Sequence, residues 1–399
     1  MKRFRSFLFG FLFILSFVDN TVYCQRRPVD WVDPLIDTHD SRWFFFSSAS
    51  RPFGMVNLSP DTKTYGVRSS WKCGYNYKTT KVRCFSHVHA WQLAGIPVMP
   101  TIGDFKGHLG MDVYQSSFSH DDEIVKPGYH RLDLEDYSIR AELTSTTRVG
   151  FHKYTFPKSD KSHIIFDVGA YLAHGPITSS EVRKVSDTEV VGYSITTALR
   201  TGPDGRARNY LLRPKEVSVY FAAVFSKPFQ EFGGWKDKQL LGDRVTSVSG
   251  KNAGGYVRFI TSDNEVILMK VGISYTSIEQ ARLNLQTELP HWDFEKVKRE
   301  SINEWNDWLS RIEVQGGSDK QKVKFYTDLW HALLGRRTLS DVDGRYCDQT
   351  GAKPVVRQVK LDKEGKPLYP HLNFDALWGT QWSCNILWSM AYPNVMDWF

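Results

Sequence analysis

The sequence predicts an exported protein of two parts, a large antiparallel β-sandwich followed by an α-helical domain. Two observations predict the fold: residues from about 28 to 270 form strand-like runs separated by turns, and helical periodicity begins near residue 275. A third observation, a short apolar run behind a basic start, predicts export. The length of 399 residues is enough for two or three domains with well-buried cores.

The first 24 residues, MKRFRSFLFGFLFILSFVDNTVYC, are typical of a secretory signal peptide. An apolar run of 11 residues, from Phe7 to Phe17, follows a basic stub and is too short to span a bilayer at about 1.5 Å per residue. Tyr23 is bulky where a lipoprotein signal requires a small residue, which argues against a lipid anchor at Cys24. We therefore expect a secreted or periplasmic protein with no transmembrane helix after signal removal.

Composition and charge argue against nucleic acid as a partner. The net charge is +7, and it falls to +5 without the first 24 residues, which carry Lys2, Arg3 and Arg5 against Asp19. The sequence has no dense block of Lys and Arg, and no aromatic–basic array of the kind that binds single strands. The aromatic content of 14%, with 13 Trp, suits either clefts that present flat faces to sugars or a large aromatic core.

Strand-like runs of β-branched and aromatic residues recur through the first two thirds of the chain. Gly and Pro bound these runs, and turn signals such as G-P-D-G at 202–205 and N-A-G-G at 252–255 separate them. No amphipathic run of helical length interrupts the pattern, which favours a large antiparallel sandwich. The clearest runs are AELTSTTRVGFHKYTFP (141–157), EVSVYFAAVFSKPF (216–229) and GGYVRFITSDNEVILMKVGISY (254–275).

The pattern then becomes helical. Thr276 and Glu279 stand in the register of a capping box, which predicts a helix start there. The segment ALWGTQWSCNILWSMAYP (376–393) is a further candidate helix that Pro393 would end, and the final NVMDWF has no polar tail, so we expect the chain to stop inside a domain. Two apolar stripes at helical spacing lie between, one of Phe294, Val297, Ile302, Trp305, Leu309 and Ile312, the other of Val323, Tyr326, Leu329, Trp330 and Leu333.

The segment GYNYKTTKVRCFSHVHAWQLAG (74–95) combines a hairpin pattern with two histidines. His87 and His89 would share one face of a strand, because side chains alternate with period two. A zinc site needs three or four ligands, and no nearby set of Cys, His or Glu completes one. Two interpretations of the histidines remain open: they form a wall that contacts a sugar or other substrate, or they make ordinary structural hydrogen bonds.

Four cysteines remain if Cys24 leaves with the signal: Cys73, Cys84, Cys347 and Cys384. If the hairpin turns at Lys78–Thr79, Cys73 and Cys84 fall opposite each other on adjacent strands, near disulfide reach. We predict that they form a disulfide, and the alternative is two buried free thiols.

One motif imitates a metal site. Asp341-Val342-Asp343-Gly344 resembles the start of a calcium loop, but the later ligands are missing, so a plain Asp-Gly turn is the preferred interpretation. No nucleophile elbow, Walker loop or dinucleotide fingerprint is present.

Four segments, taken in order, resemble glycoside hydrolase family 92, the calcium-dependent exo-acting α-mannosidases. The first contains P-F-G-M-V and L-S-P-D-T, the second G-Y-x-Y followed by F-S-H-x-H, and the third is the closest match. Together they cover nearly all of the mature chain. The segments are Val32–Thr62, Trp71–Gly95, Phe118–Pro157 and Phe325–Tyr346.

The resemblance implies an architecture and a division of the chain. The family has an N-terminal β-supersandwich of the galactose-mutarotase type, linker helices and an (α/α)6 barrel, with the substrate where the domains meet. The expected division is a signal peptide at 1–24, the supersandwich at 28–272, a helical linker at 273–320 and the truncated start of the barrel at 321–399.

The resemblance also implies site residues. Trp71, His87 and His89 would lie on the sandwich side of the pocket, as an aromatic face and imidazole donors for a sugar. The family commonly has W-D-T-F-R early in the helical domain, where Asp and Arg contact the terminal sugar. This chain has W-G-T-Q-W at 378–382 instead, so the candidates there are Trp378, Gln381 and, as a replacement carboxylate, Asp375.

The family's general acid, its base and most of its calcium ligands come later than Phe399, so no catalytic or metal-binding residue is predicted here. Inverting hydrolysis needs two carboxyl groups about 6.5–9.5 Å apart. Asp122 and Glu123 lie in the sandwich segment, where a salt bridge or hydrogen bond is preferred. The resemblance thus implies the mannose-glycan-binding half of a secreted enzyme. The alternatives are a non-catalytic carbohydrate-binding protein and a related glycosidase of altered specificity.

Overall fold

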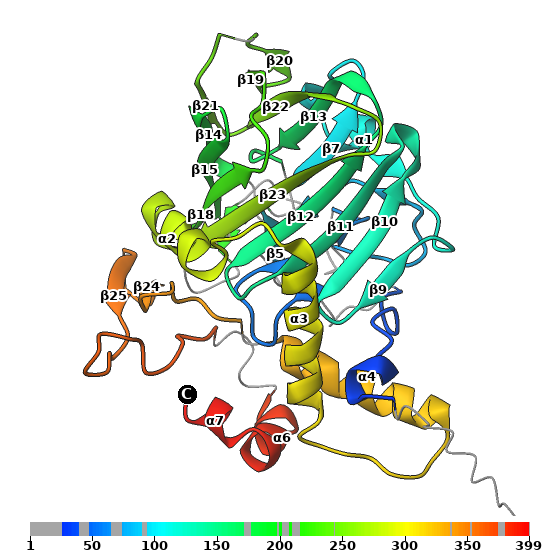
Figure 1. The fold of residues 1–399 in the computed structure, drawn as a ribbon. Coiled ribbons are helices and arrows are strands. Elements are labelled where there is room, and N and C mark those ends of the chain that lie inside the picture. The colour runs from blue at the N-terminus through cyan, green and yellow to red at the C-terminus, as the bar shows by residue number, and fades with distance from the viewer. Residues whose placement is uncertain are drawn as a thin grey trace, which may run out of the picture.

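The computed structural model describes most of the chain beyond the first 25 residues. The described residues are 26–39, 48–64, 74–89, 94–170, 177–197, 199–201, 207–209, 216–242, 244–335, 337–351, 353–373 and 380–398. Within them, strands dominate up to Ser274 and helices follow from Ile278 (Figure 1). The predicted order of a β part and then an α part is confirmed.

A nine-stranded antiparallel sheet forms one layer of the sandwich. Its central strands are long because β-branched and aromatic residues fill them, as in β18 and β23. In spatial order it contains β21 (Ser247–Gly250), β14 (Ile177–Ser186), β15 (Glu189–Thr197), β18 (Glu216–Phe225), β23 (Glu265–Ser274), β12 (Val149–Phe156), β11 (Ile139–Ser145), β10 (Tyr129–Leu134) and β9 (Ile124–Lys126).

An eight-stranded antiparallel sheet forms the second layer. Its strands are β1 (Ala49–Ser50), β2 (Asn57–Asp61), β4 (Cys84–Ser86), β7 (Val98–Ile102), β13 (Ser159–Phe166), β22 (Ala253–Thr261), β19 (Glu231–Lys236) and β20 (Gln239–Leu240). Four two-stranded pairs accompany the sheets: β3 (Lys81–Val82) with β8 (Ser116–Ser117), β5 (Val88–His89) with β6 (Ala94–Gly95), β16 (Leu199–Thr201) with β17 (Ala207–Asn209), and β24 (Arg345–Asp348) with β25 (Val355–Gln358).

The main hydrophobic core lies between the two sheets. Phe166 of β13 stacks on Phe221 of β18 with ring centroids 5.6 Å apart, and Phe85 of β4 meets Tyr154 of β12 at 6.2 Å. All four side chains are fully buried. Since each pair joins one sheet to the other, the strand alternation read from the sequence corresponds to the inner faces of a sandwich.

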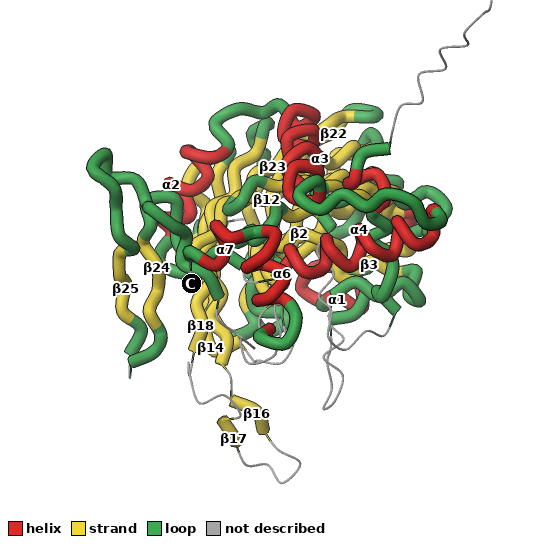
Figure 2. Tube along the Cα trace, turned by 90° about the horizontal axis from the view of Figure 1, so that it is seen from below, coloured by secondary structure: helices red, strands yellow, loops and turns green. Residues whose placement is uncertain are grey.

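The helical part covers one end of the sandwich. The helices are α1 (Met111–Tyr114), α2 (Ile278–Glu288), α3 (Phe294–Leu309), α4 (Asp319–Leu334), α6 (Cys384–Ala391) and α7 (Pro393–Met396), with 3-10 turns η1 (Pro28–Trp31), η2 (Gly107–Leu109) and η3 (Glu135–Tyr137). Helix α2 packs on the nine-stranded sheet, whereas α4, α6 and α7 lie below the sandwich (Figures 1 and 2). A separate cluster around Trp305, Trp330 and Trp388 buries most of the two predicted apolar stripes, whereas Phe294 and Val297 pack in another cluster with side chains of β10 and β12.

The helices are tied to the sandwich by buried polar contacts. Trp305 of α3 donates its indole N–H to the Ser50 carbonyl at 2.7 Å. Glu288, at the end of α2, accepts hydrogen bonds from the Arg148 guanidinium at 2.6 Å, the Arg148 backbone at 2.8 Å and the Thr146 hydroxyl at 2.6 Å. These bonds hold the two parts in one arrangement.

Two local predictions need correction. Ser277, one residue after the predicted Thr276, caps α2 and accepts from the Gln280 amide at 3.2 Å, because Thr276 donates its hydroxyl to Asp341 instead. The chain does turn at Asn76–Thr79, but in the described residues β4 then pairs with β2 and β7, while Gly74 before the turn pairs with Lys63. The expected hairpin is therefore wrong.

No helix among the described residues is both long enough and apolar enough to cross a membrane.

Candidate functional site

Asp61 and His89 form a buried ion pair that joins two of the segments singled out from the sequence. Nε2 of His89 lies 2.7 Å from Oδ1 of Asp61, and Nδ1 donates to the Asn57 carbonyl at 2.6 Å. His89 is 4% exposed and Asp61 2%. Burial opposes a charge here, yet the Asp61 carboxylate and the Asn57 carbonyl raise the pKa of His89 above its ordinary value.

His87 belongs to a separate, neutral relay. Its Nδ1 donates to the Ile96 carbonyl at 2.7 Å, so its Nε2 accepts from Nε2 of His152 at 2.8 Å. His152 in turn accepts from the Tyr154 hydroxyl at 2.9 Å. Burial lowers the pKa of His87 to about 4, and it also holds the pKa of His152 well below the ordinary value. Gly150 is required here because a Cβ would lie 2.7 Å from the His87 ring.

The two histidines do not form the sugar wall that the sequence suggested. His87 falls between β4 and β5, so the two rings do not share one strand face. Each ring nitrogen of both residues already has a protein partner, and both side chains are buried. Direct contact of either imidazole with a sugar is therefore corrected to a structural role in this arrangement.

The remaining predicted site residues are mostly outside the described part. Trp71, Asp375 and Trp378 lie there, so their convergence stays a prediction. Gln381 is described and exposed, in a turn just before α6.

Cys84 carries a free thiol. The thiol is fully buried and lies 3.4 Å from Oδ2 of Asp61, which also accepts from the Ser86 backbone amide at 3.1 Å. The predicted bridge to Cys73 is thus not formed at Cys84, and Cys73 itself lies outside the described residues. The physical reason is the missing hairpin, because β4 pairs with β2 and carries Cys84 to the Asp61 carboxylate.

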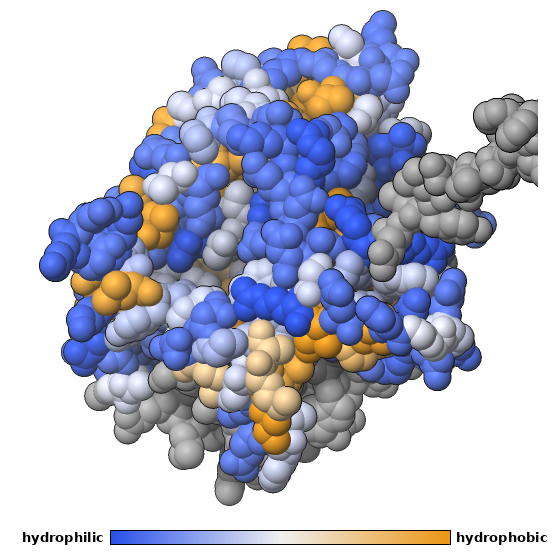
Figure 3. Space-filling view, turned by 60° about the horizontal axis from the view of Figure 1, so that its bottom comes forward, coloured by the Kyte–Doolittle hydropathy of each residue, from blue (hydrophilic) through white to orange (hydrophobic). Residues whose placement is uncertain are grey.

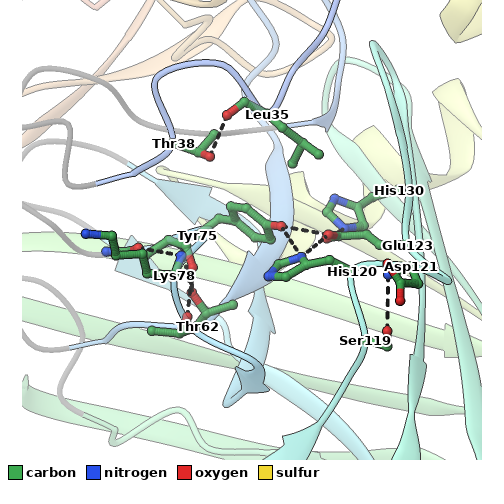
Figure 4. A network of polar contacts seen from close by, with 12 residues as sticks. Leu35, Thr38, Thr62, Tyr75, Lys78, Ser119, His120, Asp121, Glu123 and His130 are labelled. Atoms are coloured by element: carbon green, nitrogen blue, oxygen red, sulfur yellow. Dashed lines mark hydrogen bonds and ion pairs between the residues drawn. The ribbon is translucent and has the colours of Figure 1, made fainter.

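Glu123 is the centre of a polar network in the sandwich (Figure 4). Its Oε1 accepts from His130 at 2.7 Å, and its Oε2 accepts from His120 and from the Tyr75 hydroxyl, both at 2.7 Å. Burial acts to raise the pKa of Glu123, but the hydrogen bonds from His130, His120 and Tyr75 hold it below the ordinary value. With its side chain 1% exposed, Glu123 has the hydrogen-bonding role preferred from the sequence.

One group of side chains in the described residues could hold a metal ion. Asp37, Asp328 and His331 bring ligand atoms within 4.8 Å of one another. Calcium takes six to eight oxygens, whereas this set offers an imidazole nitrogen and two carboxylates, one of which binds Lys324 at 2.5 Å. The donor set does not fit calcium.

The Asp341–Gly344 motif is a turn, as preferred from the sequence. The Gly344 amide donates to the Asp341 carbonyl at 2.8 Å, and Gly344 has a φ of +87°, which favours glycine. The buried Asp341 carboxylate accepts from Ser274, Thr276 and Asn284, which lie where β23 passes into α2. The Asp341 carboxylate therefore helps to join the sandwich to the helical part.

Sequence models of one known family match both parts of the chain. The sequence model of the glycosyl hydrolase family 92 N-terminal domain matches residues 31–274, and that of the family's catalytic domain matches residues 280–399. The chain belongs to glycosyl hydrolase family 92.

Solved family 92 structures share the fold. The α-mannosidase BT3965 from Bacteroides thetaiotaomicron is 26% identical, with a TM-score of 0.74 over 89% of this chain and 46% of its own. The inverting mannosidase BT2199 from the same organism is 24% identical, with a TM-score of 0.76 over 92% of this chain and 47% of its own. A curated relative, described as an uncharacterized secreted glycosidase of Arthroderma benhamiae, is 24% identical over 82% of this chain.

The chain spans less than half the length of these relatives, 42% of the curated one and 46% and 47% of the structures.

Sequence reasoning missed Asp61, although it quoted the L-S-P-D-T motif that contains it. An aspartate in a fully buried strand was the available signal, because a buried carboxylate needs a cationic partner.

Proposed function

We propose that the complete protein is an exported exo-acting glycosidase that removes terminal α-linked mannose from glycoprotein glycans. One observation carries the proposal: the likeness to BT3965 extends across both the sandwich and the helices, at 26% identity. A second structure of BT3965 is a complex with mannoimidazole, and it matches this chain over 89% of its length with a TM-score of 0.76.

The proposed substrate site lies where sandwich and helices meet. Trp71, Trp378 and Gln381 are its proposed sugar contacts, and Asp375 is the proposed replacement for the family's aspartate. The buried pair of Asp61 and His89 supports this end of the sandwich without contacting substrate.

Inverting hydrolysis uses a carboxylic acid that protonates the leaving oxygen and a carboxylate that activates water. Glu123 is unsuitable for either role because both of its oxygens already accept protein hydrogen bonds. We therefore propose that this chain supplies sugar binding and that other residues of the complete enzyme supply acid and base. Calcium dependence is part of the proposal, and the described residues provide no calcium site.

The test uses the complete protein with α-linked mannobiose and a high-mannose N-glycan as substrates. We expect release of mannose, with the β-anomer appearing first by proton NMR, loss of activity in a chelator and its recovery with calcium. The 399-residue chain alone should bind methyl α-mannoside without turnover. If the complete protein binds mannosides and releases no monosaccharide, the non-catalytic carbohydrate-binding alternative replaces the proposal.

A second candidate, a glycosidase of altered specificity, is favoured by one observation. Gly379 and Trp382 stand where the family commonly has Asp and Arg. Loss of a carboxylate and a guanidinium changes which hydroxyls of the terminal sugar find a charged partner. A panel of aryl α-glycosides in which another sugar is cleaved at least tenfold faster than mannose would select this candidate.

A further inference from the structure

A pocket opens in the sandwich at the end away from the helices. Its volume is about 400 Å³, within the range of about 300–1,000 Å³ that is common for small-molecule sites. Its walls come from η2 and α1, from the residues after β13, and from the turn between β19 and β20. Figure 1 shows β19 and β20 at the top of the molecule and α6 and α7 at the opposite end.

A buried carboxyl group lines this pocket. Asp167, directly after β13, is 8% exposed, and its Oδ2 accepts from the Tyr114 hydroxyl at 2.8 Å. Its other oxygen makes no hydrogen bond within the described part of the chain. Burial raises the pKa of Asp167 to about 7, so near neutrality the carboxyl can either donate or accept a hydrogen bond.

Further polar groups surround Asp167. Asp237 and Lys238 form the two-residue turn between β19 and β20, and both have positive φ angles, of +49° and +66°. Asn252 donates to the Asp237 carboxylate at 2.9 Å, and on the other side Nδ1 of His108 is buried without a hydrogen-bond partner in the described residues. The pocket lining therefore contains both hydrogen-bond donors and acceptors.

A glycine leaves room for an indole ring at the pocket wall. Trp235 lies in β19 opposite Gly254, where a Cβ would stand 2.1 Å from the indole ring. The indole is 4% exposed, so only its edge can meet a ligand. A polar pocket with an aromatic edge suits a ligand that has hydroxyl groups on an apolar ring.

The charged groups that line the pocket indicate which class of ligand it can bind. Two carboxyl groups, of Asp167 and Asp237, disfavour phosphate or sulfate, and Lys238 with His108 disfavours a simple cation. We propose that this pocket binds one neutral sugar residue, at a site separate from the junction of sandwich and helices. In this proposal, which rests on the proposed function, the pocket holds a glycan through a sugar other than the one cleaved at the junction, and it catalyses no reaction.

The experiment measures sugar binding to the 399-residue chain by saturation-transfer NMR and calorimetry, with methyl α-mannoside, methyl α-glucoside and N-acetylglucosamine. We expect at least one sugar to bind, and Asp167→Asn to raise its Kd about tenfold, because a charge-assisted hydrogen bond is lost. Asp160→Asn is the matched control, since Asp160 is exposed on β13, the strand that precedes Asp167, and the Kd of this variant should equal that of the wild type.

A second variant protects the test against misfolding of Asp167→Asn. Asn252 is exposed, so Asn252→Trp should fold normally while its side chain blocks the pocket. We expect this variant to lose the same binding event. The proposal is overturned if no sugar binds, or if Asn252→Trp binds every sugar with the stoichiometry and Kd of the wild type, because all of the binding would then belong to the proposed junction site.

Discussion

At the scale of single residues, His87 and His89 show how burial and partners shift pKa in opposite directions two positions apart. The Asp61 carboxylate that His89 faces raises the pKa of this imidazole, whereas burial beside a carbonyl and a second imidazole lowers the pKa of His87. The H-x-H spacing alone predicts neither pKa shift. Burial alone does not distinguish the two imidazoles either, because both side chains are buried. The nearest charged group decides between them.

The neutral state of His87 should make the protein sensitive to acid. An unfolded histidine has a pKa near 6.5, and the folded pKa of His87 is about 4. Between these values only the unfolded chain binds this proton, so His87 by itself lowers stability by about 3 kcal/mol as pH drops from 6.5 to 4, and other buried histidines such as His152 add to the loss. We expect urea unfolding at pH 4.5, 5.5 and 6.5 to show this slope. His87→Gln should flatten it and His291→Gln should not, and equal slopes in all three proteins would refute the assignment.

Loss of the Asp61 charge should destabilise the fold without changing sugar capture. Asp61→Asn leaves the buried His89 cation without its partner, at a cost of roughly 3–5 kcal/mol in the free energy of unfolding. The control Asp104→Asn removes a carboxylate from an exposed pair with Lys161 and should change nothing measurable. If Asp61→Asn keeps its stability and the complete enzyme shows a raised KM, the pair contacts substrate after all.

Cys84 should behave as an inert thiol. Burial raises the pKa of its thiol well above the ordinary value, and the nearby Asp61 carboxylate acts in the same direction. Without reductant, iodoacetamide should label Cys84 only after denaturation. A protein whose Cys84 stays unlabelled in denaturant until reductant is added contains the disulfide that the sequence suggested.

At the scale of elements, the joint between sandwich and helices depends on several hydrogen bonds to one carboxylate, that of Glu288 at the end of α2. Glu288 accepts from the loop between β11 and β12 through both of its oxygens, and its side chain is 13% exposed. The Arg148 guanidinium also donates to the Ser340 carbonyl at 2.7 Å, so a third segment joins the same contact.

Glu288→Gln should loosen this joint. The amide keeps the shape but loses the charge that three donors share, so we expect a loss of about 2–3 kcal/mol in the free energy of unfolding. Glu295→Gln, half-exposed on α3, is the control and should stay within about 0.5 kcal/mol of the wild type. A loss for Glu288→Gln no larger than that of the control would show that apolar packing alone holds the joint.

At the scale of the whole molecule, the face below the sandwich carries exposed hydrophobic side chains (Figure 3). On α6 and just before it, Trp382, Ile386 and Met390 recur every four residues and are 70%, 56% and 81% exposed. Trp388 on the same helix is 1% exposed and packs in the aromatic cluster. A patch of this kind favours self-association of the 399-residue chain.

Replacing the exposed stripe should improve solubility without affecting the fold. Trp382→Gln combined with Met390→Gln should reduce light scattering at high protein concentration and leave the melting temperature unchanged. Trp388→Gln is the matched comparison on the same helix and should lower the melting temperature by several degrees, because it removes buried apolar surface. A melting temperature that drops equally in both cases would mean that the stripe is packed.

Much of the architecture could be predicted because it rests on local, repeated signals. The apolar stripes that form α3 and α4 and the alternation in β18 and β23 follow directly from side-chain period. The first helix start was predicted one residue early, since Thr276 and Ser277 are both good caps and a distant carboxylate, Asp341, takes the first of them.

The sequence by itself determined the family and the order of a β part and an α part. Only the tertiary structure decided that β4 pairs with β2, which places Cys84 beside Asp61 and leaves it a free thiol. It also decided that the pKa of His89 is raised, that the pKa of His87 is lowered and that Asp167 lines a pocket. The reason is physical: strand pairing and pKa depend on groups far apart in the chain, whereas side-chain periodicity depends only on near neighbours.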